Sequence, residues 1–177
     1  MLEEEKKYRA QGFSLIVGVD EAGRGPLAGP VCAAACLLPV DFKNDDINDS
    51  KQLTEKKREA LFPIIEEKAL AYGIAFASAL EIDKYNIYEA TKMAMRRAIE
   101  QIQIPYDLIL TDAMPLKGFS KPVVPIIKGD AKAENIAAAS ILAKVTRDHF
   151  MIELDQQYPG YGLKNIRVMV LKSILPH

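Results

Sequence analysis

Apolar and polar positions along the chain fall into two patterns: short apolar runs bounded by glycine or proline, and longer stretches with apolar residues at helical spacing. The short runs predict β-strands and the longer stretches predict α-helices. We expect strands at 15–19, 31–38, 72–80, 106–112 and 122–130. We expect helices at 55–70, 87–102 and 133–158. Strands first, followed by alternating helices and strands, predict an α/β domain with a mixed central β-sheet flanked by helices.

Local signals support these helices. Thr54 stands before the first helix and Asn86 before the second, and both residue types cap helix N-termini. Pro63 falls inside the first helix, where it removes a backbone donor and favours a kink. The small residues at 137–140 allow the third helix to approach the sheet closely.

Composition narrows the class of protein. The 177 residues suit one domain with a sizeable core, and 49% hydrophobic with 27% charged residues is typical of a globular protein. Apolar runs are far shorter than the ~20 residues of a membrane-spanning helix, and the acidic start MLEEEKKYRA does not fit a secretory signal. We therefore expect a cytoplasmic monomer that does not contact membranes.

The few cysteines and histidines and the net charge limit which metals and which binding partners the protein can have. Cys32 and Cys36 are spaced as neither a redox pair nor a zinc motif, so we expect both to be reduced core residues. His149 and His177 are the only histidines, so any metal should be bound by oxygen. A net charge of −1 argues against a protein that coats nucleic acid by charge alone. Six cations could still form a local basic groove, with a solvated surface as the simpler alternative: Lys117, Lys121, Lys128, Lys132, Lys144 and Arg147.

Carboxylates stand at the ends of three expected strands. Asp20 and Glu21 follow the first strand, and Asp112 and Asp130 end the fourth and fifth. Sites in α/β proteins form at strand ends, so these acids could meet at one edge of the sheet. Clustered carboxylates repel one another unless a cation lies between them, which favours Mg²⁺ or Mn²⁺. Alternatively, a single aspartate after a strand often begins a turn or caps a helix.

A glycine-rich loop follows the acidic pair. Gly23, Gly25 and Ala28 fit a variant of the dinucleotide-binding fingerprint, which must open a helix. Two prolines interrupt the loop, and too few residues separate it from the next strand for a crossover helix, which disfavours that reading. The alternative is that the glycines let the backbone approach a ligand closely, while Arg24 supports a phosphate or the loop itself.

Four motifs together resemble the bacterial ribonuclease HII family: GVDEAGRGPLAGPV, NDSKQLTEKKRE, LTDAMPL and KGDAKAENIAAASILAKVTRD. The resemblance covers about nine-tenths of the chain and implies a ribonuclease H-like fold. It implies a metal-dependent endonuclease that cuts RNA paired to DNA, or ribonucleotides embedded in duplex DNA, leaving 5′-phosphate and 3′-hydroxyl ends. Mg²⁺ or Mn²⁺ is the implied cofactor. The catalytic, metal-binding carboxylates then fall on Asp20, Glu21, Asp112 and Asp130.

The same resemblance implies substrate-binding residues. The loop of Gly23, Arg24 and Gly25 would read the 2′-hydroxyl of a ribonucleotide, chiefly through backbone groups. Four more residues become candidates for phosphate contacts or for support of the site: Ser50, Lys51, Lys144 and Arg147.

The resemblance stops after Gly162, so we divide the chain into a catalytic domain at 1–162 and a divergent tail at 163–177. Codons allowed for 163–174, read with one extra base in front, also encode FEKHKGYGTKEH, which has the family's pattern at this point. We therefore hypothesise a frameshift, which places Met169 where the family has a junction-sensing tyrosine. An authentic divergent tail is the alternative. Either way we expect impaired activity, especially at single ribonucleotides, with a weak or inactive hybrid-binding remnant as the alternative function.

Overall fold

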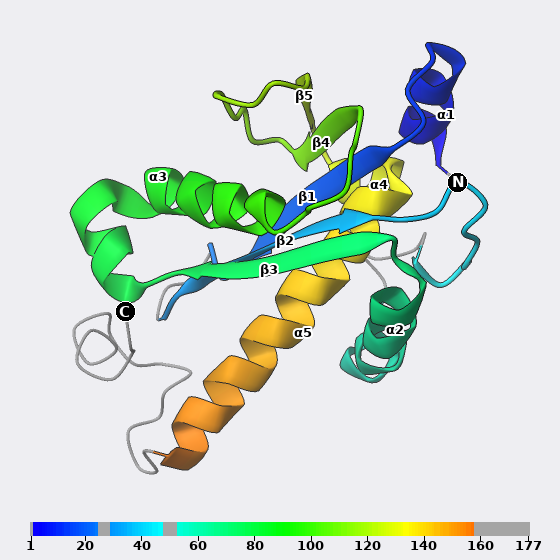
Figure 1. Cartoon of the computed structure of the whole chain (residues 1–177). Helices are drawn as coiled ribbons and strands as arrows, with labels where there is room; N and C mark the ends of the chain where they lie inside the picture. The colour runs from blue at the N-terminus through cyan, green and yellow to red at the C-terminus, as the bar shows by residue number, and fades with distance from the viewer. Residues whose placement is uncertain (1, 25–28, 48–52, 158–177) are drawn as a thin grey trace.

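A mixed sheet forms the centre of the molecule (Figure 1). In the computed structural model, which describes residues 2–24, 29–47 and 53–157, the sheet contains five strands in the order β3-β2-β1-β4-β5. β2 pairs antiparallel with β1 and β3, whereas β4 is parallel to β1 and β5. The predicted mixed sheet is therefore confirmed. The strands are β1 (Ile16–Ala22), β2 (Val31–Leu37), β3 (Ala71–Ala77), β4 (Leu108–Asp112) and β5 (Val123–Ile126).

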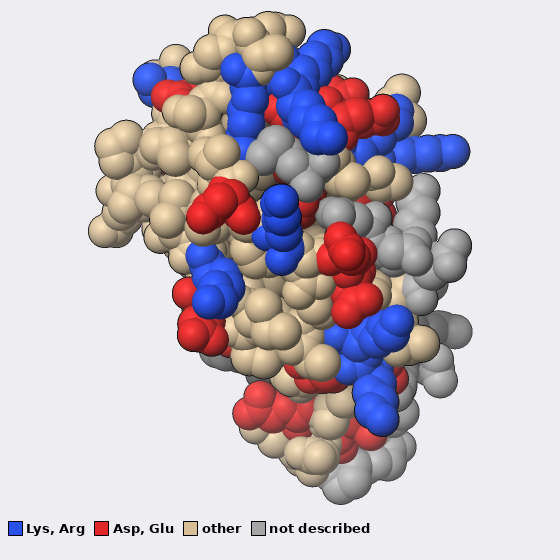
Figure 2. Space-filling model, turned by 90° about the vertical axis from the view of Figure 1, so that its right-hand side faces the viewer, with Lys and Arg blue, Asp and Glu red and all other residues tan. Residues whose placement is uncertain are grey.

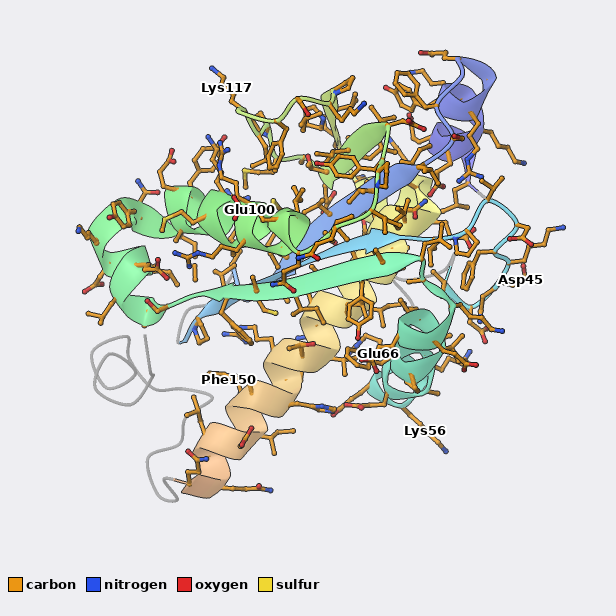
Figure 3. All side chains as sticks on the ribbon, in the orientation of Figure 1. Asp45, Lys56, Glu66, Glu100, Lys117 and Phe150 are labelled. Atoms are coloured by element: carbon orange, nitrogen blue, oxygen red, sulfur yellow. The ribbon has the colours of Figure 1, made fainter. Side chains whose placement is uncertain are left out.

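Helices cover both faces of the sheet. α3 lies on one face, and α5 crosses the other with α2 beside it (Figure 1). Phe150 on α5 contacts Phe76 of β3, with ring centroids 4.9 Å apart (Figure 3). The small residues of β2 are buried on both faces and let the helices approach. The helices are α1 (Glu3–Ala10), α2 (Glu55–Lys68), α3 (Ala79–Glu100), α4 (Gly129–Lys132) and α5 (Glu134–Gln157).

The start of α5 is fixed by a buried carboxylate. Glu5 of α1 is fully buried, and its two oxygens accept hydrogen bonds from the backbone N–H groups of Glu134 and Asn135, both at 2.7 Å. The amide oxygen of Asn135 in turn accepts from the N–H of Leu38, also at 2.7 Å. These bonds satisfy N–H groups that a helix N-terminus otherwise leaves unpaired. They also tie α1, α5 and the end of β2 together.

Gly18 lets α5 touch β1. A Cβ atom at this position would lie 2.2 Å from the carbonyl carbon of Asn135 and 2.3 Å from the nitrogen of Ile136, both backbone atoms. Only glycine leaves room for so close an approach between a strand and a helix. Because Asp20 follows two residues later, this contact also sets the position of the acidic end of β1.

The sequence-based boundaries hold for α2 and fail in part for α3. Thr54 caps α2, with its hydroxyl accepting from the N–H of Lys57 at 3.2 Å. α3 begins at Ala79 rather than after Asn86, because Ser78 and Glu81 form a capping box. α1 and α4 were not predicted.

Asn86 divides α3 into two halves. Its φ of 72° and ψ of 165° are not helical. Its side-chain oxygen accepts from the N–H of Glu89 at 3.0 Å, so it caps the second half of the helix. The predicted capping role of Asn86 is thus confirmed, although α3 starts earlier.

Both cysteines are buried and free, which confirms their predicted place in the core. On the face shown in Figure 2, Lys and Arg are interspersed with Asp and Glu, and neither sign dominates. In the described part of the chain, none of the helices is long and apolar enough to cross a membrane.

An ion pair between the two halves of α3, Glu81 and Arg97, makes the stability of the fold depend on pH in the acid range. Arg97 donates to Glu81 at 2.9 Å and holds the pKa of that carboxyl at about 2, against an ordinary value of 4.5. Because the pKa is lowered in the folded state, the stabilisation is present above pH 4.5 and is lost as the pH falls towards 2.

We expect Glu81→Gln to lower the free energy of unfolding by about 1 kcal/mol at pH 7, since the pair is partly exposed and screened by solvent. The loss should be smaller at pH 3. Urea unfolding at both pH values measures it, with the exposed α2 residue Glu67→Gln as the control. A loss of equal size at both pH values would contradict the role assigned to the ion pair.

Candidate active site

Asp20 and Glu21 lie within β1 rather than after it. Alternation along the strand places Asp20 on the face of Gly18, towards α5, and Glu21 on the face of Val19, towards α3. Asp20 is 4% exposed, and its Oδ1 accepts from the backbone N–H of Glu21 at 2.8 Å. At the strand end the two carboxyl groups still approach each other, because the side chains of Asp20 and Glu21 share a hydrogen bond.

Asp112 joins this pair through strand pairing. β4 runs parallel to β1, so the two carboxyl ends lie at the same edge of the sheet. Asp112 is the last residue of β4, and its Oδ1 accepts from the N–H of Gly129 at 2.9 Å.

Asp130 does not end a strand, which corrects the prediction. β5 ends at Ile126, and Lys128 adopts the left-handed conformation with φ 56° before α4 begins at Gly129. Asp130 lies in the first turn of α4, directly after the residue that binds Asp112. The chain turn after β5 thus brings the fourth acid to the same neighbourhood.

The electrostatics of the cluster disfavour several ionised carboxylates at once. Burial raises the pKa of Asp20 well above its usual range, and the nearby carboxylates of Glu21 and Asp112 raise it further. Burial also raises the pKa of Glu21, against the lowering effects of its hydrogen bond with Asp20 and the charge of Arg24. Such shifts are frequent at functional sites, because burial and like charge both act against the charged form.

The donor chemistry fits an oxygen-bound divalent cation. Oε2 of Glu21 is buried and has no hydrogen-bond partner. A cation would satisfy it and relieve the repulsion between the carboxylates. Within the described residues, the side chains do not form a group of three or more acids, histidines or cysteines already arranged to hold a metal ion.

Arg147 supports the glycine loop. Its Nε donates to the carbonyl of Pro30 at 2.9 Å, and a Cβ on Gly23 would lie 2.1 Å from the same nitrogen. Gly23 also has a φ of 95°, which favours glycine. One arginine of α5 therefore contacts both ends of the loop.

Arg24 links the loop to the acids. Its Nη1 lies 4.0 Å from Oε1 of Glu21, and its guanidinium lies over the ring of Tyr88, 5.5 Å from the centroid. Tyr88 and its neighbour Lys92 belong to no motif identified in the sequence. Their spacing of four residues puts them on one helix face, but contact with Arg24 depends on the tertiary fold.

The other predicted substrate-binding residues either make contacts of their own or lie outside the described residues. Lys144 of α5 forms an ion pair with Asp148 at 3.3 Å. Lys117, one of the six cations of the expected groove, projects outward from the loop between β4 and β5 (Figure 3). Gly25, Ser50 and Lys51 lie outside the described residues, as does the tail at 163–177.

Comparisons with known proteins agree on one family. The family described as Ribonuclease HII matches residues 17–166. Ribonuclease HII of Listeria monocytogenes serotype 4a (strain HCC23) is 54% identical over 168 residues, covering 93% of this chain and 64% of that protein. The chain therefore spans less than two thirds of the length of this curated relative.

Solved structures share the fold. The crystal structure of ribonuclease H2 from Pyrococcus horikoshii OT3 superposes with a TM-score of 0.71 at 32% identity, covering 84% of this chain and 79% of that one. Bst-RNase HIII, solved in complex with Mn²⁺, gives a TM-score of 0.69 at 18% identity over 84% of this chain and 57% of that one. The mixed sheet and its flanking helices are thus a ribonuclease H-like fold. With this fold, and with the family match over most of its length, the chain belongs to the ribonuclease HII family.

Proposed function

We propose that this chain is a divalent-metal-dependent endonuclease that hydrolyses the RNA strand of RNA–DNA hybrids. The observation that carries the proposal is the meeting of Asp20, Glu21 and Asp112 at one sheet edge, where burial and like charge raise the pKa of Asp20. Membership of the ribonuclease HII family supports the same activity. The proposal extends to ribonucleotides embedded in duplex DNA and to products with 5′-phosphate and 3′-hydroxyl ends.

The four acids would hold the metal. Asp20, Glu21 and Asp112 supply carboxylate oxygens from two neighbouring strands, and Asp130 supplies another from α4. Mg²⁺ or Mn²⁺ fits this all-oxygen set, and the complex of Bst-RNase HIII with Mn²⁺ is consistent with it. When bound, such an ion supplies Lewis-acid stabilisation of the charge that develops on phosphate oxygens during hydrolysis.

The loop after β1 would select the substrate. Gly23 lets the side chain of Arg147 pack against the loop backbone, and its neighbour Arg24 lies beside Glu21. The 2′-hydroxyl distinguishes RNA from DNA, and backbone groups can both donate to it and accept from it. Arg147 acts here as support for the loop, through Pro30 and Gly23. Gly25, Ser50, Lys51 and Lys144 stay candidate substrate contacts.

The tail is part of the proposal. We take 1–162 as the catalytic domain and 163–177 as a divergent, frameshifted tail with Met169 in place of the family's tyrosine. We expect this change to weaken cleavage at a single ribonucleotide more than cleavage of a long hybrid. The proposal also takes the protein to be a cytoplasmic monomer that acts on nucleic acid.

Cleavage of three labelled duplexes tests the function: an RNA–DNA hybrid, DNA with one ribonucleotide, and all-DNA. We expect cutting of the hybrid in Mg²⁺ or Mn²⁺, weaker cutting at the single ribonucleotide, and none of the all-DNA duplex or in EDTA. Asp130→Asn should abolish cutting, because it removes one of the negative charges that would hold the metal. Binding of the hybrid without any cleavage would instead identify an inactive remnant. Equal cutting of the hybrid and of the single-ribonucleotide duplex would contradict the expected effect of the altered tail.

A further inference from the structure

A row of charged and aromatic side chains extends from the acidic cluster onto α3. The ring of Tyr88 lies beneath two cations, the guanidinium of Arg24 at 5.5 Å and the ammonium group of Lys92 at 4.5 Å from the centroid. At one end of the row, Arg24 lies 4.0 Å from Glu21. At the other, Lys92 lies 3.8 Å from Glu89. The row therefore begins at a candidate metal ligand and leads away from it.

The row is open to solvent and places two cations over one exposed ring, with Glu21 and Glu89 at its two ends. Tyr88 is 37% exposed, and the side chains of Arg24 and Lys92 are 42% and 23% exposed. Two cations on one ring repel each other. Glu89 offsets this repulsion only weakly, because it is 53% exposed and surface ion pairs contribute little. Lysine and arginine side chains bind phosphates, and an aromatic ring can hold an arginine in place through a cation–π contact.

The non-helical residue Asn86 sets the orientation of the helix segment that carries Tyr88 and Lys92. Its φ of 72° with ψ of 165° belongs to a region that residues other than glycine rarely adopt. The hydrogen bond from the N–H of Glu89 holds the break and starts the second half of α3. Tyr88 lies in the first turn of that half-helix. A strained residue thus fixes the segment that presents Tyr88 to Arg24.

We propose that the row of Arg24, Tyr88 and Lys92 binds the backbone of the RNA–DNA hybrid next to the acidic site. Tyr88 is a positioning residue that holds Arg24 beside the loop that follows β1. Lys92 binds a phosphate of the same duplex. This inference rests on the proposed function and adds two α3 residues to the substrate-binding surface.

The first test is binding of a fluorescent RNA–DNA hybrid in EDTA, which does not depend on turnover. Lys92→Gln should weaken binding several-fold and reduce the slope of log K against log salt by about 1, because one phosphate contact is lost. Tyr88→Leu should weaken binding several-fold, because Arg24 loses the ring that holds it in place. Tyr88→Phe should bind as the wild type does, because it retains the ring.

Steady-state cleavage separates positioning from a structural role. Tyr88→Leu should raise KM several-fold while kcat changes little, since the variant binds both substrate and transition state less well. The melting temperature should stay unchanged, because Tyr88 is a partly exposed residue.

The same helix offers a matched control. Tyr85 is 42% exposed and carries Lys84 over its ring at 5.1 Å from the centroid. It precedes the break at Asn86 and lines a hollow with Ser78 and Glu81. Tyr85→Leu and Lys84→Gln repeat the two chemical changes, and we expect both to bind the hybrid like the wild type.

The outcomes separate this inference from the proposed function. If the wild type fails to cleave but the binding pattern appears, the function is wrong and the binding surface is supported. If the wild type cleaves while Tyr88→Leu and Lys92→Gln bind normally, the inference is wrong. Equal damage from Tyr88→Phe and Tyr88→Leu, or from the Tyr85 and Lys84 controls, would also overturn it.

Discussion

Asp20→Asn is expected to reduce kcat on an RNA–DNA hybrid by roughly 10³-fold or more while leaving the protein folded. Asp20 is almost fully buried and lies near the carboxylates of Glu21 and Asp112. The substitution removes a charged metal ligand, and a metal's stabilisation of developing charge is worth several kcal/mol, or about a factor of ten for each 1.36 kcal/mol. Single-turnover cleavage with saturating enzyme measures the loss.

The same substitution should not destabilise the fold in metal-free buffer. Asparagine has nearly the shape of aspartate, and its oxygen can still accept from the N–H of Glu21. It also removes one carboxylate from a buried site shared with Glu21 and Asp112. We therefore expect the free energy of unfolding to stay the same or to rise by up to about 1 kcal/mol. Urea unfolding measures this.

Asp45→Asn is the matched control, because Asp45 is an exposed acid in the segment between β2 and α2 (Figure 3). It should change neither rate nor stability. Retention of cleavage by Asp20→Asn, or loss of cleavage through unfolding, would contradict the role given to Asp20.

Gly18→Ala is expected to destabilise the fold by about 3 kcal/mol, at the upper end of the usual cost of overpacking. The added Cβ would lie 2.2 Å from backbone atoms of α5, which a side-chain rotation cannot relieve. Either α5 or β1 must move. Glu5 resists such a movement, because it holds the N-terminal N–H groups of α5 at 2.7 Å. Urea unfolding of the variant and the wild type measures the difference.

The expected loss of stability is opposite in sign to the usual effect of replacing glycine by alanine. In a strand without a close neighbour, replacing glycine by alanine normally stabilises by roughly 0.5–1 kcal/mol, because glycine loses more backbone freedom on folding. A variant as stable as the wild type would therefore show that β1 and α5 do not approach as closely as the structure has them. We also expect reduced cleavage, since Asp20 follows on the same strand.

Local sequence signals predict much of the fold. Thr54 and the apolar spacing after it indicate α2, and the run VCAAACL indicates a strand buried on both faces. The start of α3 was also readable, because Ser78 and Glu81 have capping-box spacing. α1 carries no such signal. Its one buried residue is the polar Glu5, and the reason for that burial lies on a helix far along the chain.

The candidate site was predictable in its residues more than in its geometry. The acidic pair in β1 is unusual enough to stand out, and the family resemblance adds Asp112 and Asp130. That Asp112 meets the pair depends on the parallel pairing of β4 with β1, which no local pattern encodes. The contact of Tyr88 with Arg24 likewise depends on the break at Asn86 and on the packing of α3.

The most direct test of the account is single-turnover cleavage of one labelled RNA–DNA hybrid by the wild type and by Asp20→Asn, in Mg²⁺ and in EDTA, with hybrid binding measured in parallel. The account predicts cutting by the wild type in Mg²⁺ alone, 5′-phosphate and 3′-hydroxyl ends, and binding without cutting by the variant. Cutting by the wild type in EDTA, or equal cutting by both proteins, would contradict a metal-dependent site built on these carboxylates.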